Sequence, residues 1–120
     1  MSRTVMIVDD SLFMRKILRG ILVEKGYTVA AEAASGIEAM KKLHSKHPDI
    51  ILLDIILPDS NGLDLLESMI NACPDSKVVV CSSIGQAQVI QKSLELGAKA
   101  FIQKPFTPEK VVEVLDSLEG

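Results

Sequence analysis

The sequence is poor in several features that would each indicate a particular class of protein. It has only two cysteines in 120 residues, Cys73 and Cys81, and neither belongs to a CxxC pair or a cluster of possible ligands. We interpret both as reduced thiols, so neither a disulfide framework nor a cysteine-based metal site is expected. The formal net charge of −3 provides no basic excess for binding a nucleic acid directly.

Long apolar segments and an export signal are also missing. No apolar run approaches the roughly 20 residues that a membrane-spanning helix needs. The first residues lack the pattern of a signal peptide. We therefore expect a cytoplasmic protein without a membrane association. At 48% hydrophobic residues, residues 1–120 should form a single domain with a substantial core, and a monomer is the expected state.

The sequence does contain short apolar runs that are typical of buried strands. Ile50–Leu53 has four consecutive large apolar residues, as in a strand of a parallel sheet that is covered on both faces. Val5–Val8 and Lys77–Cys81 are similar, whereas Thr28–Ala31 and Lys99–Gln103 are weaker.

Segments with apolar residues at helical spacing separate these runs. The helices expected are Phe13 to before Gly26, Ser35 to about His44, Leu63 to Ile70, Val89 to Leu96, and Thr107 to Leu118. Alternation of five strands with five helices predicts an α/β fold, a doubly wound five-stranded parallel sheet with right-handed crossovers. In the flavodoxin-like (βα)5 order 2-1-3-4-5, the first and third strands are neighbours.

Carboxylates follow these two neighbouring strands. Asp9 and Asp10 come after Val5–Val8, and Asp54 comes after Ile50–Leu53. The three would meet at the carboxyl edge of the sheet, where open α/β sheets bind ligands. Carboxylates that close repel one another unless a cation lies among them, and Mg²⁺ prefers oxygen ligands. Taken alone, Asp54 could equally end its strand or serve a turn.

Polar residues at the ends of the fourth and fifth strands complete a pattern. Ser82 follows the fourth strand and Lys104-Pro105 the fifth. Together with Asp9-Asp10 and Asp54, they make the sequence resemble the receiver domain of two-component response regulators, from Val5 to about Leu118. Because no effector domain follows within the 120 residues, the chain is most similar to stand-alone chemotaxis regulators of the CheY type.

The resemblance implies a function and a role for each residue. Asp54 would accept a phosphoryl group from a sensor histidine kinase or acetyl phosphate, and Lys104 and Ser82 would neutralise charge on that group. Without the other residues of this pattern, we would interpret Lys104 as a surface lysine and Ser82 as a helix cap. The Lys104–Pro105 bond should be cis. The ligands of Mg²⁺ would be Asp9, Asp10, Asp54 and the backbone carbonyl of Ile56.

The resemblance also implies how the signal is passed on. Ser82 would move toward the phosphoryl group and Phe101 would rotate into the space that it leaves. The fourth helix, fifth strand and fifth helix would then bind a downstream protein. Chemotaxis regulators often carry tyrosine where this chain has Phe101, so a contact through a tyrosine hydroxyl is not possible here. Such a domain would catalyse only its own phosphorylation and dephosphorylation.

Two positions near the site depart from the polar residues that family members often have there. They are Ile56 and Ile84, two residues beyond Asp54 and Ser82. Our hypothesis is that these apolar side chains exclude water and slow dephosphorylation.

Other functions remain open at this point. The chain could be the receiver module of a larger transcriptional regulator or part of a phosphorelay. A phosphohydrolase with an aspartyl nucleophile would need a second acid where Ile56 stands. A flavodoxin-like small-molecule binder would need a phosphate-binding loop after the first strand, and Asp9–Phe13 is acidic and bulky instead.

Overall fold

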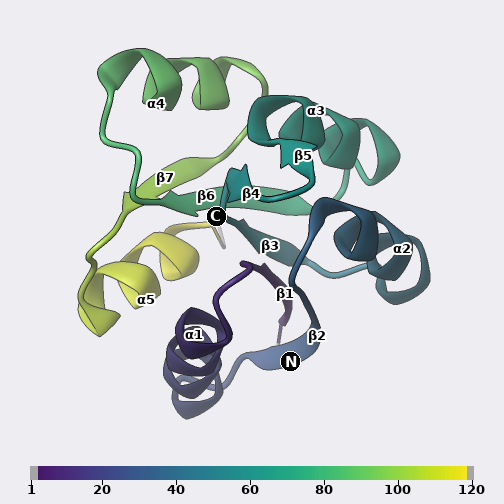
Figure 1. Ribbon diagram of the computed structural model, residues 1–120. Helices are drawn as coiled ribbons and strands as arrows, with labels where there is room; N and C mark the ends of the chain where they lie inside the picture. Colours follow the sequence, from purple (N-terminus) through teal and green to yellow (C-terminus); the bar gives the residue numbers. More distant parts are fainter. Residues whose placement is uncertain (1–2, 119–120) are drawn as a thin grey trace.

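A computed structural model of the chain describes residues 3–118. These residues form a five-stranded sheet, a two-stranded hairpin and five helices (Figure 1). The sheet contains β1 (Thr4–Val8), β2 (Thr28–Ala33), β3 (Ile50–Leu53), β6 (Lys77–Ser82) and β7 (Ala100–Gln103), and the hairpin contains β4 (Ile56–Leu57) and β5 (Ser60–Asn61). The helices are α1 (Leu12–Glu24), α2 (Gly36–Lys46), α3 (Gly62–Ala72), α4 (Ala87–Glu95) and α5 (Pro108–Ser117).

The sheet confirms the predicted fold class and strand order. Its strands lie in the order β2-β1-β3-β6-β7 and all neighbouring pairs are parallel. This is the expected 2-1-3-4-5 order, because β6 and β7 are its fourth and fifth strands in sequence. In the pairing of β1 with β3, Val8 lies opposite Leu53. The residues that follow each strand are therefore neighbours at the carboxyl edge.

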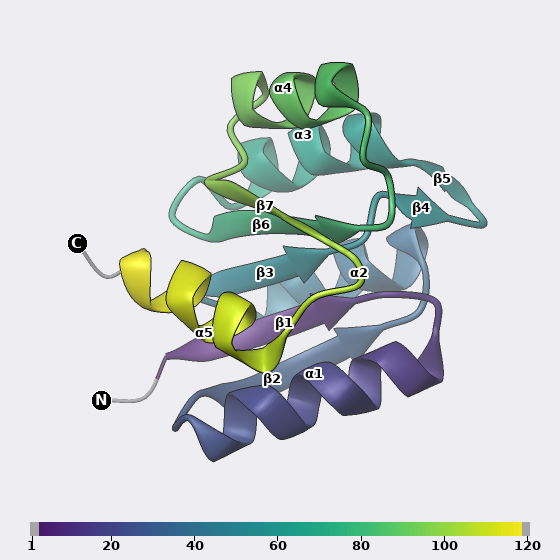
Figure 2. The same cartoon turned by 90° about the vertical axis from the view of Figure 1, so that its left-hand side faces the viewer.

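Helices cover both faces of the sheet, α1 and α5 on one side and α2, α3 and α4 on the other (Figures 1 and 2). β3 shows why its sequence has no polar alternation. Ile50 and Leu52 belong to the core on the α1–α5 side, and Ile51 and Leu53 to the core on the opposite side. Complete burial of each such side chain contributes about 1.5–3 kcal/mol of transfer free energy, so both faces favour a continuous apolar strand.

The segment after β3 is more structured than the sequence predicted. In place of a simple turn, β4 and β5 form a short antiparallel hairpin. Its Asp59 carboxylate accepts hydrogen bonds from the backbone N–H groups of Gly36 at 2.9 Å and Ile37 at 3.1 Å, at the start of α2. These two bonds lower the pKa of Asp59 from its ordinary value. A Cβ at Gly36 would lie 2.0 Å from the Ser60 Oγ, so glycine permits this close approach.

The end of α2 also differs slightly from the prediction. The helix continues to Lys46, two residues beyond the expected end at His44. His47 then adopts the left-handed conformation with a φ of 44°, which ends the helix before Pro48. Among residues 3–118, no helix combines the length and the apolar character that a bilayer crossing would need.

Candidate functional site

The site begins with two aspartates that leave neighbouring strands side by side. The Asp9 N–H donates to the carbonyl of Ala33 in β2 at 3.0 Å, and the Asp54 N–H donates to the carbonyl of Val8 at the end of β1 at 2.9 Å. Both aspartates are buried, with 2% and 6% of their surface exposed, whereas Asp10 is exposed. Carboxylate oxygens of all three residues lie within 4.8 Å of one another, as the strand order predicted.

Lys104 joins the two buried carboxylates. Its Nζ lies 2.6 Å from the Asp9 Oδ2 and 2.9 Å from the Asp54 Oδ2. The backbone N–H of Lys104 donates to the Ser82 carbonyl at 2.9 Å, and the bond to Pro105 is cis, as expected. Burial acts to lower the pKa of Lys104, but its hydrogen bonds and charge interactions with both aspartates outweigh burial and raise that pKa. The lysine is therefore firmly cationic.

The second oxygen of each buried carboxylate accepts a backbone hydrogen bond. The Asp9 Oδ1 accepts from the N–H of Ser11 at 2.9 Å, and the Asp54 Oδ1 accepts from the N–H of Ile56 at 2.8 Å. Each aspartate thus fixes the turn that follows its own strand. The Ser11 Oγ in turn accepts from the Met14 N–H at 3.1 Å and caps α1.

The charge of this cluster fits a hard divalent cation. Three carboxylates and one ammonium leave a formal excess of two negative charges in a partly buried place. The available ligands are oxygens, which Mg²⁺ binds in preference to nitrogen or sulfur. The residues present at this edge therefore suit Mg²⁺, and Asp9, Asp10 and Asp54 are the side chains that could hold it.

Ser82 lies beside Lys104, and Phe101 lies further from the edge in the neighbouring strand β7. Ser82 is fully buried, and its hydroxyl accepts a hydrogen bond from the Ile84 N–H at 3.4 Å, so it faces the loop that follows β6. Ser83 is exposed, consistent with its interpretation as a turn residue. Phe101 lies opposite Val80 in the sheet and is partly buried against the core beneath α2, α3 and α4.

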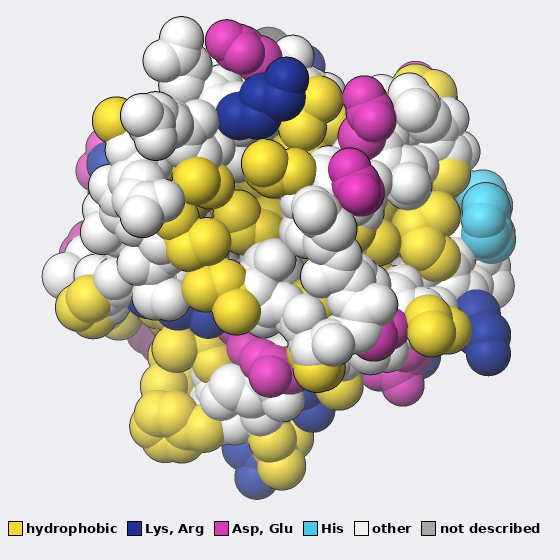
Figure 3. All heavy atoms as spheres, turned by 45° about the horizontal axis from the view of Figure 1, so that its top comes forward, with side chains coloured by type: hydrophobic (Ala, Val, Ile, Leu, Met, Phe, Trp, Pro, Cys, Tyr) yellow, Lys and Arg dark blue, Asp and Glu magenta, His cyan; other side chains and the backbone are white. Residues whose placement is uncertain are grey.

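The cluster has an apolar border. Ile56 is 47% exposed, and Ile84 lines a hollow of about 250 Å³ between the hairpin and the start of α4. Hydrophobic side chains gather in the middle of the face that α3 and α4 form, with acidic side chains beside them (Figure 3). The Ile56 N–H contacts Asp54, whereas the use of its carbonyl as a metal ligand stays a prediction.

Two residues that shape the site were not identified from the sequence. Asp59 fastens the loop after Asp54 to α2, and the Arg15 guanidinium donates to the carbonyl of Asp9. The available signals were weak: an acid after Pro58 in a turn, and a basic residue one turn into a helix. Neither pattern tells which distant backbone group the side chain reaches.

Comparison with known proteins agrees with this arrangement. Residues 5–116 match the response regulator receiver domain, so the chain belongs to this family of signalling domains and is a two-component response regulator. It is 42% identical to the chemotaxis protein CheY of Thermotoga maritima over 98% of both chains. It is 34% identical to CheY of Bacillus subtilis, over 97% of both chains.

A solved structure is also similar. The crystal structure of the CheX-CheY-BeF3-Mg²⁺ complex from Borrelia burgdorferi contains a chain that superposes with a TM-score of 0.93 and 34% identity. The match covers 97% of this chain and 88% of that one. The family and the fold expected from the sequence are therefore confirmed.

Proposed function

We propose that residues 1–120 act as a single phosphorylation-dependent switch in which Asp54 accepts the phosphoryl group. The observation that carries this proposal is the position of Lys104, whose ammonium contacts both Asp54 and Asp9. A cation in that place neutralises charge where a phosphoryl group would arrive. Asp54 itself is only 6% exposed, yet it lies at the open carboxyl edge of the sheet.

In the transfer step, a carboxylate oxygen of Asp54 attacks phosphorus. A new oxygen–phosphorus bond forms while the bond from phosphorus to the donor breaks, and the donor keeps the electron pair. The donor is a phosphohistidine of a sensor kinase, whose imidazole is the leaving group, or acetyl phosphate, whose leaving group is acetate. Such a transfer depends on positioning and on neutralising the equatorial oxygens. Lys104 supplies a positive charge for this, and the Ser82 hydroxyl becomes a donor if it turns from the loop.

Asp9, Asp10, Asp54 and the carbonyl of Ile56 are the proposed holders of Mg²⁺. When bound, this ion supplies charge neutralisation for the phosphoryl oxygens. The excess negative charge of the three carboxylates supports this assignment. The Borrelia relative, whose crystallised complex includes Mg²⁺, supports it as well.

The output is a change in a protein-binding surface made by α4, β7 and α5. An aspartyl phosphate carries roughly two negative charges in place of the one on the carboxylate, and these attract Ser82 and Lys104. Movement of Ser82 would leave room for Phe101, which is only partly buried in the resting structure. The exposed Leu94 on α4 gives this surface an apolar contact point for a downstream protein. The domain turns over no substrate other than its own phosphoryl group.

Intact mass after incubation with acetyl phosphate tests the proposal. The native chain should gain one phosphoryl group only when Mg²⁺ is present, and Asp54→Asn should gain none. Asp75→Asn is a matched control, because Asp75 is an exposed carboxylate in the loop before β6, at the opposite edge of the sheet. It should react as the native chain does. An adduct that persists in Asp54→Asn would overturn the assignment of the acceptor.

A further inference from the structure

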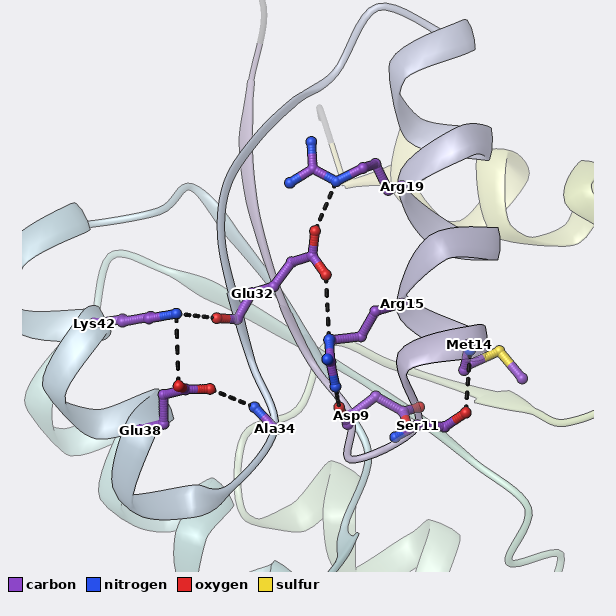
Figure 4. A network of polar contacts seen from close by, with 9 residues as sticks. All are labelled: Asp9, Ser11, Met14, Arg15, Arg19, Glu32, Ala34, Glu38 and Lys42. Atoms are coloured by element: carbon purple, nitrogen blue, oxygen red, sulfur yellow. Dashed lines mark hydrogen bonds and ion pairs between the residues drawn. The ribbon is translucent and has the colours of Figure 1, made fainter.

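Arg15 contacts the backbone of the Asp9–Asp10 turn and not its carboxylates. This side chain comes from the first turn of α1, and its Nη1 donates to the Asp9 carbonyl at 2.5 Å. Its Nε donates to the Glu32 Oε1 at 3.2 Å, so one guanidinium joins the turn to β2 (Figure 4). Only 14% of the Arg15 side chain is exposed. A planar guanidinium can bind two acceptors in fixed directions, which a single ammonium cannot do.

These contacts close a ring around Asp9. Its N–H is bonded to Ala33, the residue after Glu32 in β2, and its carbonyl is bonded to Arg15, which is bonded to Glu32. Both backbone groups of Asp9 are thus linked to the edge strand β2, the N–H directly and the carbonyl through Arg15. Because Asp10 directly follows the held carbonyl, the direction of its side chain depends on the same ring.

Glu32 is itself held in place by residues from two helices. Its Oε2 accepts from the Arg19 Nε at 2.6 Å, and its backbone carbonyl accepts from the Lys42 ammonium (Figure 4). Lys42 also lies 3.8 Å from the Glu38 carboxylate. The anchor of Arg15 therefore does not depend on Arg15 alone.

We infer that Arg15 is a positioning residue that orients the Asp9–Asp10 turn for binding a divalent cation. It acts through the Asp9 carbonyl and touches neither carboxylate. The inference rests on the metal site proposed above. Residues that orient metal ligands from behind are typically worth tenfold or more in metal affinity.

Electrostatics alone gives the opposite expectation. A positive charge behind the turn repels a divalent cation, so its removal without any change in geometry should tighten cation binding. Loss of the orienting contact should weaken it. The sign of the change in Mg²⁺ affinity therefore separates a positioning residue from a nearby charge.

The experiment is calorimetric titration of the unphosphorylated full chain with Mg²⁺, comparing the native chain, Arg15→Gln and Arg19→Gln. Arg19 is a matched control, because it also bonds Glu32 and its replacement removes the same charge. Unlike Arg15, it is 48% exposed and makes no hydrogen bond to the Asp9 carbonyl. We expect Arg15→Gln to bind Mg²⁺ about tenfold more weakly and Arg19→Gln to stay within about twofold of the native chain. Unchanged or tighter binding by Arg15→Gln would overturn the inference.

A second measurement distinguishes positioning from a general loss of structure. In Arg15→Gln, the Mg²⁺ concentration for half-maximal phosphorylation by acetyl phosphate should rise, while the rate at saturating Mg²⁺ stays near the native rate. A lower rate at saturation with an unchanged midpoint would overturn the inference. Arg15→Lys keeps the charge but cannot bond Glu32 and the Asp9 carbonyl together as the guanidinium does, so it should also weaken Mg²⁺ binding. This variant replaces Arg15→Gln in the experiment if Arg15→Gln does not fold. Native affinity in Arg15→Lys would overturn the inference.

The failures of the two proposals can be told apart. If the native chain binds no Mg²⁺, the proposed metal site falls, and this inference falls with it. If the native chain binds Mg²⁺ and forms the Asp54 adduct while Arg15→Gln binds as tightly, only the role of Arg15 is wrong.

Discussion

The sheet has an amino edge, where its parallel strands begin, and a carboxyl edge, where they end. Both edges carry polar side chains, but the pairing of these side chains differs. At the amino edge, the Asp49 Oδ2 accepts from the N–H and the hydroxyl of Thr4 at 2.9 and 3.2 Å, and Thr4 Oγ1 accepts from the Asp49 N–H at 3.0 Å. The Ser76 hydroxyl donates to the Pro48 carbonyl, and Lys77 donates to the Leu118 carbonyl. At the carboxyl edge, three carboxylates cluster around one lysine, which pairs with Asp9 and Asp54.

The difference separates stability from function. The amino edge matches donors with acceptors, so its polar groups hold strands and chain ends together. The carboxyl edge keeps an excess of negative charge, which costs stability and attracts a cation. Substitutions at the amino edge should therefore alter unfolding without altering chemistry, whereas those at the carboxyl edge should alter chemistry in ways that stability does not predict.

The largest effect is expected from Lys104→Met at the carboxyl edge. The rate of phosphorylation by acetyl phosphate should fall about a hundredfold, because one donor to the developing charge is lost. Mg²⁺ should bind more tightly, because the competing ammonium is gone. Intact-mass time courses and calorimetry measure the two effects. Lys99→Met, which removes an exposed lysine just before β7, is the control. A phosphorylation rate within twofold of native would contradict the role of Lys104.

The apolar border of the same edge gives a smaller kinetic effect. Ile56→Asn combined with Ile84→Glu should shorten the lifetime of the phosphorylated protein by about tenfold, because polar groups there can orient water, as in weak general-base catalysis. Loss of the mass adduct with time, after the donor is removed, measures this. Ile37→Asn changes an exposed isoleucine on α2 and should have no effect. The hypothesis fails if the double variant decays at the native rate.

Asp49→Ala tests the amino edge. It removes the acceptor of two hydrogen bonds from Thr4, which should lower the free energy of unfolding by about 1–2 kcal/mol. Urea unfolding measures this loss. Mg²⁺ affinity and the phosphorylation rate of the folded protein should match those of the native chain. A change in either would show that the two edges are coupled.

The smallest effect concerns Asp59, an acid near the carboxyl edge that is paired as completely as Asp49. Backbone hydrogen bonds lower its pKa below the ordinary 3.8, so its contribution to stability is present above that pH and lost as the pH falls through the native value. The stability difference between the native chain and Asp59→Ala should thus be constant above about pH 4.5 and shrink in more acidic solution. Urea unfolding at several pH values measures it, and a difference that grows toward low pH would contradict the assignment.

Much of this organisation could be predicted from the sequence because it depends on strand order. Ile50–Leu53 predicts a strand buried on both faces, and the parallel order then places Asp9 beside Asp54 without knowledge of any side chain. Lys104 follows from the same rule, because it leaves another strand at the same edge.

The contacts that the sequence did not predict depend on the position of the tip of a side chain. The order of the strands does not determine that position. Arg15 reaches the Asp9 carbonyl only because α1 packs at one rotation against β2, and Asp59 reaches α2 only because the hairpin folds over Gly36. Neither the helix rotation nor the path of the hairpin is set by apolar periodicity, which fixes a face but not an atom.

The bridge that Lys104 makes between Asp9 and Asp54 has a consequence for how the site responds to its surroundings. A cation tethered to the chain has an effective local concentration that dilution does not lower. A Mg²⁺ ion that binds at the proposed site must compete with it, so a titration would report an apparent affinity that already includes displacement of the tethered ammonium. At the proposed Mg²⁺ site, the Lys104 side chain would thus help to set the ion concentration that is needed for occupancy.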